Sequence, residues 1–169
     1  MLLTIVLTVI ALLIAADQII KIWVLHYLAG NPSQLVIPHL LQLTYVENRG
    51  AAFGILQGRA GILSISTLAI IIVLLVLLIR KKFHKNLLAM WCVALIIAGG
   101  AGNLIDRIFR GFVVDYLDIS PLFHFPVFNL ADCCVVIGTF LLMFYLFFLE
   151  GRQPKKKQAE DIKGDGEAG

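Results

Sequence analysis

The chain contains 169 residues, of which 60% are hydrophobic and 15% are charged, and its formal net charge is +3. Soluble domains carry about 25% charged residues, so this composition excludes an ordinary soluble protein and favours an integral membrane protein. The basic residues gather in two short runs beside apolar segments. This placement is typical of membrane topology signals, and it argues against nucleic-acid binding.

The first predicted element is an apolar helix at the start of the chain. Leu2 to Ala16 carries no charge, and the apolar character resumes around Asp17 and Lys21 as far as Ala29. A cleavable signal peptide ending at Ala15-Ala16 is a competing interpretation. However, no basic residue precedes the apolar run, no small-x-small triplet follows it, and the apolar pattern continues past the cleavage point. The segment is therefore predicted to be a retained membrane-spanning helix.

The connection after this helix is long and is expected to have structure of its own. It contains Pro32 and Pro38, and apolar and polar side chains alternate from Leu41 to Val46. Alternation of this kind predicts one or more short strands resting at the membrane surface. Long connections that carry structure are usually functional.

Three further apolar runs carry no charge and are long enough to cross the bilayer. A hydrocarbon core of about 30 Å needs roughly 20 apolar residues in a helix. The predicted helices cover Ala60 to Ile79, Leu87 to Ile105, and Cys133 to Leu149 with an apolar lead-in from Phe125. Between the third and fourth helices, Arg107 to His124 mixes apolar and acidic residues, and we interpret it as a re-entrant or interfacial segment.

Positive charge predicts the orientation of the four helices, because short loops rich in Lys and Arg stay in the cytoplasm. Such residues occupy Arg80 to Lys85, between the second and third helices, and Arg152 and Lys155 to Lys157 after the fourth. The sequence therefore predicts an all-α membrane protein with N-in/C-in topology and a small extracytoplasmic β-containing region between helices 1 and 2. Residues 1–150 form its single domain, and residues 151–169 are expected to be a disordered basic cytoplasmic tail.

Polar residues of unusual position converge on the outer side of this bundle. They fall at the end of the first helix, the start of the second, the end of the third and the start of the fourth. An ionisable group at membrane depth is costly unless it is paired or wetted, so such residues are candidates for a functional site. The candidates are Asp17, Lys21, Asn48, Gly50, Asn103, Asp106, Arg107, Asp115, Asn129 and Asp132.

Each candidate also has a purely structural interpretation. Asp17 and Lys21 are spaced i and i+4, which fits an ion pair that stabilises the helix equally well. Asp106 and Arg107 fit an interfacial anchor, and Asn129 followed by Asp132 fits the cap of a helix. Asp118 is interpreted as a loop charge. The convergence of all the candidates on one face, more than any single residue, favours a site.

The residue types limit the chemistry of such a site. No His-Glu-x-x-His motif is present, and the four histidines have no ligand spacing, so neither a metal nor a cofactor is expected. No serine has a Gly-x-Ser-x-Gly context, and Cys92, Cys133 and Cys134 lie in apolar helical context. The carboxylates are therefore the remaining candidates for catalytic groups. Two aspartates held together in a partly dry site share a proton, as in aspartic proteases. From depth in the helix alone, Asp106 ranks ahead of Asp115.

Five sequence blocks, in order, carry a resemblance to a known family. The chain resembles bacterial lipoprotein signal peptidase (signal peptidase II) from about residue 17 to residue 140. Five ordered blocks are far more specific than any one of them. The blocks are Asp17-Gln18-Ile19-Ile20-Lys21, Asn48-Arg49-Gly50-Ala51-Ala52-Phe53, Gly99-Gly100-Ala101-Gly102-Asn103-Leu104-Ile105-Asp106-Arg107, Val113-Val114-Asp115-Tyr116 and Phe128-Asn129-Leu130-Ala131-Asp132.

The resemblance implies roles for individual residues. It implies that Asp115 and Asp132 are the catalytic pair and that the other candidates support the site or bind substrate, with Asn48 and Gly50 near the substrate backbone. Two departures from the family pattern, Tyr116 and Cys133, touch neither carboxylate. The eight supporting candidates are Asp17, Lys21, Asn48, Gly50, Asn103, Asp106, Arg107 and Asn129.

The resemblance also implies a reaction and a location. The reaction is removal of the signal peptide from diacylglyceryl-modified prolipoproteins by cleavage just before the lipidated cysteine. The expected partners are these prolipoproteins and membrane lipids, with no nucleic acid, and the expected state is a monomer. The implied location is a bacterial inner membrane, with the active site toward the extracytoplasmic face.

Two functions of other classes compete with this one. A small ion- or proton-coupled transporter also places acids in a helical bundle. Its path needs polar groups at the midplane, and the second and fourth helices offer almost none there. A non-enzymatic membrane scaffold would leave the buried acids without a purpose.

Overall fold

The computed structural model describes residues 1–50, 59–80, 82–83 and 86–149. Within them lie four helices long and apolar enough to cross a membrane, as the uncharged runs predict. Their bounds are α1 (Leu2–Tyr27), α2 (Ala60–Ile79), α3 (Leu87–Phe109) and α4 (Leu130–Phe144), which a π-helical turn, η2 (Tyr145–Leu149), extends. The predicted tail, residues 151–169, and Lys81, His84 and Lys85 of the basic connection lie outside the described residues.

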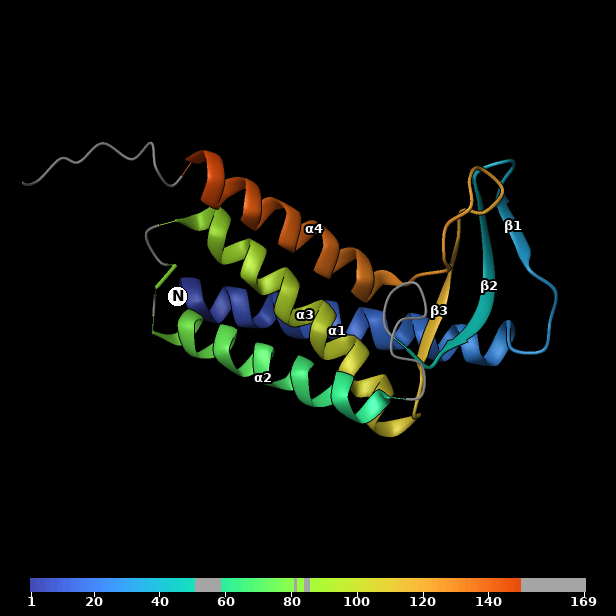
Figure 1. Cartoon of the computed structure of the whole chain (residues 1–169), viewed down its shortest axis with the longest axis horizontal. Helices are drawn as coiled ribbons and strands as arrows, with labels where there is room; N and C mark the ends of the chain where they lie inside the picture. The colour runs from blue at the N-terminus through green and yellow to red at the C-terminus, as the bar shows by residue number, and fades with distance from the viewer. Residues whose placement is uncertain (51–58, 81, 84–85, 150–169) are drawn as a thin grey trace, which may run out of the picture.

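Helix α3 is the centre of the bundle. It packs against α1, α2 and α4, and α2 and α4 lie on opposite sides of it (Figure 1). Most of α3 is buried, whereas the other three helices turn most of their side chains outward, as expected where lipid replaces water. Small residues allow the close approach of α3 to α4. A Cβ at Gly99 would lie 2.2 Å from the backbone oxygen of Ala131.

Helix α3 extends past its predicted apolar run, which ends at Ile105, whereas α1 ends within the predicted segment. Helix α3 ends at Phe109, so Asp106 and Arg107 lie within its last turn and not after it. Helix α1 continues to Tyr27, well past Asp17. Its buried positions after that point, which recur at helical spacing, are Asp17, Lys21, Val24 and Leu28. The apolar pair Val24 and Leu28 packs against the sheet, so the last turns of α1 connect the bundle to the sheet.

The sheet has three antiparallel strands in the order β1 (Gln34–Ile37), β2 (Leu41–Asn48) and β3 (Val113–Asp118). The first two confirm the strands predicted after the first helix. The third lies in residues 107–124, interpreted from the sequence as a re-entrant or interfacial segment without a predicted strand, and it extends the β region beyond the first connection. In the register of β2 and β3, Val46 lies opposite Asp115. The sheet lies at one end of the bundle, opposite the α2–α3 connection (Figure 1).

Candidate active site

Asp115 and Asp132 line one cavity of about 770 Å³, together with the amides Asn48 and Asn103 and the guanidinium of Arg107. Asp115 lies in β3 and Asp132 in the first turn of α4, so the sheet and the bundle each supply one carboxylate. The rest of the wall is mainly apolar. It comes from α2, α3, α4 and the segment between β3 and α4. The two acids therefore belong to a small polar part of an otherwise apolar cavity.

Both oxygens of Asp115 accept hydrogen bonds from amide side chains. Asn129 Nδ2 donates to Oδ1 at 2.6 Å, and Asn48 Nδ2 donates to Oδ2 at 2.9 Å. The amide of Asn48 is oriented by the backbone, because Gly50 N–H donates to its Oδ1 at 3.0 Å. Its NH₂ group is thereby turned toward the carboxylate.

Asp132 also accepts at both oxygens. Asn103 Nδ2 donates to Oδ1 at 2.7 Å, and the backbone N–H of Asn129 donates to Oδ2 at 3.2 Å. In return, Asn129 Oδ1 accepts from the backbone N–H of Asp132 at 2.9 Å, which completes a capping box at the start of α4. The capping interpretation of Asn129 and Asp132 is therefore confirmed. Asn129 also contacts Asp115, and Asp132 lines the cavity, so the residues that cap α4 are part of the site.

Burial raises the pKa of Asp115 to about 7, and the nearby negative charge of Asp132 acts in the same direction. The amide donors Asn48 and Asn129 and the positive charge of Lys21 oppose this shift. A carboxyl group with such a pKa is protonated in a large fraction of molecules near neutral pH. One of two adjacent acids can therefore hold a proton while the other is ionised.

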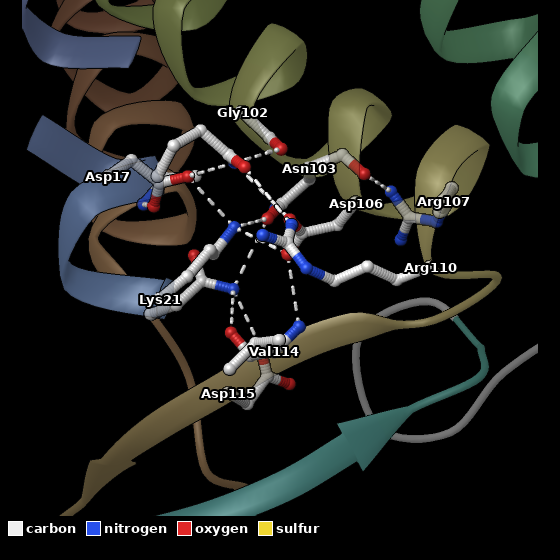
Figure 2. A network of polar contacts seen from close by, with 12 residues as sticks. Asp17, Lys21, Gly102, Asn103, Asp106, Arg107, Arg110, Val114 and Asp115 are labelled. Atoms are coloured by element: carbon white, nitrogen blue, oxygen red, sulfur yellow. Dashed lines mark hydrogen bonds and ion pairs between the residues drawn. The ribbon is translucent and has the colours of Figure 1, made fainter. Parts of the chain in front are cut away.

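A buried ionic cluster lies directly behind the carboxylates (Figure 2). Lys21 is fully buried, and its Nζ lies 2.9 Å from Asp17 Oδ2 and 3.0 Å from Asp106 Oδ2. Arg110 pairs with Asp106 from one turn further along α3. Gln18 joins them, since its Nε2 donates to Asp106 Oδ1 at 3.2 Å and its Oε1 accepts from Arg110 at 3.0 Å. The i, i+4 ion pair predicted for Asp17 and Lys21 is thus part of a larger network.

The two acids of this cluster also hold the backbone next to the candidate catalytic pair. Asp106 Oδ2 accepts from the N–H of Val114 at 3.1 Å, directly before Asp115. Asp17 Oδ1 accepts from the N–H of Ala131 at 3.1 Å, directly before Asp132. These contacts argue against the ranking of Asp106 ahead of Asp115. Asp106 is committed to ion pairs and a backbone contact, and it is not among the residues that line the cavity.

Arg107 connects α3 to the end of the β2 segment. Its Nη2 donates to the backbone oxygen of Gly50 at 3.2 Å. Residues 51–58, which contain the rest of that sequence block, lie outside the described residues. Arg107 and Gly50 are therefore brought to the site, and the expected contact of Gly50 with substrate stays a prediction.

Asp118 lies apart from the other acids, and its interpretation as a loop charge is wrong. It ends β3 and is 7% exposed. Its carboxylate accepts from Gln42 Nε2 at 2.6 Å and from the N–H of Ser120 at 2.8 Å. These donors lower the pKa of Asp118 against the effect of burial. Asp118 connects β3 to the neighbouring strand β2 and does not line the cavity.

Three contributors were not singled out as site residues from the sequence. Gln18 and Arg110 complete the ionic cluster, and Tyr116 Oη accepts from the N–H of Leu130 at 3.2 Å at the start of α4. The i, i+4 spacing of Asp106 and Arg110 was a usable signal for one of them. Among the described residues, no group of three or more His, Cys, Asp or Glu side chains is arranged to hold a metal ion.

Comparison with known proteins decides the family. A family model described as "Signal peptidase (SPase) II" matches residues 9–148. The chain belongs to the signal peptidase II family. It is 44% identical to a lipoprotein signal peptidase of Clostridioides difficile (strain 630), over 85% of this chain and 95% of that protein. It is also 44% identical to one of Halothermothrix orenii (strain H 168), over 82% of this chain and 92% of that protein.

The fold has been seen in solved structures. A bacterial membrane enzyme determined at 2.3 Å resolution aligns with a TM-score of 0.76 and 30% identity, covering 98% of this chain and 94% of that one. A second, at 1.9 Å resolution, aligns with a TM-score of 0.77 and 34% identity over 86% of this chain and 94% of that one. As a signal peptidase II, the chain is a peptidase, and its four long apolar helices fit a multi-pass membrane protein. The resemblance stated from the five sequence blocks is therefore confirmed.

Proposed function

We propose that this signal peptidase II is an aspartic endopeptidase that removes the signal peptide from diacylglyceryl-modified prolipoproteins by cleaving just before the lipidated cysteine. The observation that carries the proposal is the pair Asp115 and Asp132, which face one cavity in a chain whose relatives are named lipoprotein signal peptidases. Within the described part of the chain, no other acid lines this cavity. Asp115 and Asp132 are the catalytic residues, and the remaining candidates orient them or contact substrate.

In the proposed reaction, the ionised carboxylate of the pair takes a proton from a water molecule. The water oxygen attacks the carbonyl carbon before the lipidated cysteine, while the protonated carboxyl of the pair donates its proton to the carbonyl oxygen. When the tetrahedral intermediate collapses, the C–N bond breaks, the carboxyl that took the proton from water gives it to the cysteine nitrogen, and the other carboxylate takes a proton from a hydroxyl of the intermediate, which restores the pair. The raised pKa of Asp115 supports a pair with one ionised and one protonated carboxyl, because it allows one proton to stay on the pair near neutral pH.

The shape and lining of the cavity support a lipid-borne substrate. Thr67, Ile70 and Ile71 of α2 and Val136 and Ile137 of α4 line it from either side of α3. Since α2 and α4 pack on opposite sides of α3 (Figure 1), the cavity that they line together crosses one face of α3, and we propose that it opens sideways toward the lipid. An apolar signal helix and acyl chains that already lie in the bilayer would reach the carboxylates sideways through this opening. Only the bond to be cleaved then needs to meet water.

The proposal is tested with purified full-length protein in lipid vesicles and one prolipoprotein prepared with and without the diacylglyceryl group on its cysteine. We expect release of the signal peptide from the lipidated form, with a new N-terminus at the modified cysteine by mass spectrometry. The unmodified form should be cleaved far more slowly, because it lacks the acyl chains that occupy the apolar cavity. Equal cleavage of both forms, or cleavage at another bond, would contradict the proposed substrate.

We also propose that the site faces the extracytoplasmic side of the membrane. The sheet and the site lie at one end of the bundle, and the basic α2–α3 connection lies at the other (Figure 1). Since Lys- and Arg-rich connections stay in the cytoplasm, the opposite end is outside. Tags inserted between Arg80 and Lys85, or after Glu150, should report the cytoplasm, and tags near Pro32 or Ser120 the outer side. A cytoplasmic report from either outer tag would reverse the orientation.

A further inference from the structure

Lys21 lies behind the active-site cavity and is not among the residues that line it. Its side chain is 0% exposed, and its ammonium has three acceptors: Asp17 Oδ2 at 2.9 Å, Asp106 Oδ2 at 3.0 Å and Asn103 Oδ1 at 2.9 Å. An ammonium has three N–H groups and only donates. The third contact therefore requires that the amide of Asn103 present its oxygen, and not its nitrogen, to Lys21 (Figure 2).

This contact determines how the Asn103 amide is turned. Its Oδ1 accepts from Lys21 Nζ and from Asn129 Nδ2, at 2.9 and 3.2 Å, which uses both lone pairs. Its Nδ2 is left to donate to Asp132 Oδ1 at 2.7 Å. A flipped amide would place its NH₂ group against two donors and its oxygen against a carboxylate. Every contact would then be repulsive.

The orientation of the Asn103 amide also determines how Asn129 contacts Asp115, the other carboxylate of the pair. Because Asn129 Nδ2 donates to Asn103 Oδ1, the same NH₂ group is directed at Asp115 Oδ1, to which it donates at 2.6 Å. With Asn48 and the backbone N–H of Asn129, every recorded partner of the two carboxylates in the described part of the chain is a donor. A proton carried by the pair therefore finds no acceptor among these neighbours, and it is directed into the cavity.

We propose that Lys21 is a positioning residue of the peptidase: through Asn103 Oδ1 it holds the two amides so that they donate only to Asp115 and Asp132, and it thereby directs the shared proton toward substrate. This role goes beyond neutralising Asp17 and Asp106. The inference rests on the proposed aspartic mechanism.

The charges around Lys21 determine how its loss would change the pH profile. Asp17 of α1 and Asp106 of α3 contact its ammonium, and Arg110 pairs with Asp106. The pair Asp115 and Asp132 lies beyond Asn103, in the cavity that Arg107 also lines. The positive charge of Lys21 favours the ionised form of Asp115 and lowers its pKa. Without this charge the pair gives up its protons less readily, so both limits of the activity profile move to higher pH.

The test compares the double variant Asp17→Asn/Lys21→Met with Asp17→Asn alone. The double variant removes one buried charge of each sign and leaves Asp106 paired with Arg110, so it avoids the unpaired carboxylates that Lys21→Met would create. The single variant keeps the lysine, and the amide oxygen of the substituted side chain can still accept from the N–H of Ala131. The two variants differ only at residue 21, so any difference between them reports the loss of the Lys21 contacts with Asn103 and Asp106.

Relative to Asp17→Asn, we expect the double variant to lose roughly 100-fold in kcat, as misplaced catalytic groups do. KM should stay within about twofold, since Lys21 does not line the cavity and uniform binding is unchanged. Both limits of the pH profile should move upward. An equal kcat per folded molecule, with unchanged pH limits, would overturn the inference and leave Lys21 a purely structural residue.

Two further measurements keep the test decisive. Asp17→Asn/Lys21→Gln retains an N–H donor for Asn103 without the charge, so it should show an intermediate kcat and still shift the pH limits upward. If the Lys21→Met double variant does not fold, the Lys21→Gln double variant takes its place. Unchanged pH limits in the Lys21→Gln double variant would equally overturn the inference. Asp115→Asn and Asp132→Asn are measured alongside. If they remain active, the aspartic mechanism fails; if they are inactive while both lysine variants behave as Asp17→Asn, only the role of Lys21 fails.

Discussion

Asp115→Asn and Asp132→Asn should each abolish cleavage of a lipidated prolipoprotein while the protein still inserts and folds. Asparagine keeps the size of aspartate but cannot ionise, so neither variant can share a proton across the pair. We expect a loss of at least about 10³-fold in kcat, as for other members of a catalytic unit. The fold should survive at a cost of about 1 kcal/mol, because one amide donor now faces another at Asp115. Initial rates and thermal unfolding of each variant measure both effects.

The double variant Asp115→Asn/Asp132→Asn should be scarcely less active than either single one, since members of one unit are not additive. Asp118→Asn is the matched control. It lies on the same strand and keeps an acceptor for the N–H of Ser120, so it should retain most activity. Wild-type activity should fall at high pH, as the pair loses its last proton near the raised pKa of Asp115, about 7, and at low pH, as both acids become protonated. Substantial cleavage by Asp115→Asn would mean that the catalytic role had been assigned to the wrong carboxylate.

Gly99→Ala should destabilise the protein and reduce cleavage, although it adds only a methyl group. A Cβ at this position would lie 2.2 Å from the backbone oxygen of Ala131 and 2.8 Å from Val135 Cγ2. The helices α3 and α4 must therefore move apart where Asn103 meets Asp132. Overpacking of this kind costs about 1–3 kcal/mol, and here it also displaces a catalytic residue. Thermal unfolding and the initial rate of cleavage are the measurements.

Gly100→Ala provides the control for stability, because it adds the same methyl group one residue further along α3. Its Cβ would point toward α2 and lie 3.4 Å from Ile71, an ordinary van der Waals distance. We expect unchanged or slightly raised stability, since alanine is the better helix former. Equal unfolding temperatures for the two variants would refute the claim that Gly99 determines the spacing of α3 and α4.

The spans of the bundle could be predicted from the sequence because the bilayer imposes local rules. A spanning helix satisfies its own backbone hydrogen bonds and needs an apolar run of sufficient length, and both properties can be recognised from the sequence of one segment. The cap of α4 was equally legible, since the Asn129 and Asp132 contacts join residues three apart. The end of α3 was predicted too early because Asp106 and Arg107 are charged, yet both are held by partners within the fold.

The strand β3 was missed for a different reason. Residues Val113 to Tyr116 are all buried, so no alternation of apolar and polar side chains marks them as a strand. Their strand conformation depends on pairing with β2, which lies far away along the chain. Pairing between distant segments leaves no periodic signal in either one.

By itself, the sequence determined the four helices and, through its five ordered blocks, most of the residues that the fold brings together at the candidate site. From position alone it ranked Asp106 ahead of Asp115, because two aspartates near a helix end are chemically alike until their neighbours are known, and only the family resemblance reversed that order. The physical difference between the two acids comes from the tertiary structure. It places Asp106 against Lys21 and the N–H of Val114, which leaves that acid fully engaged, and it places Asp115 beside the cavity with Asp132. A carboxylate's role depends on which donors, charges and solvent reach it, and these come from segments that only folding brings together.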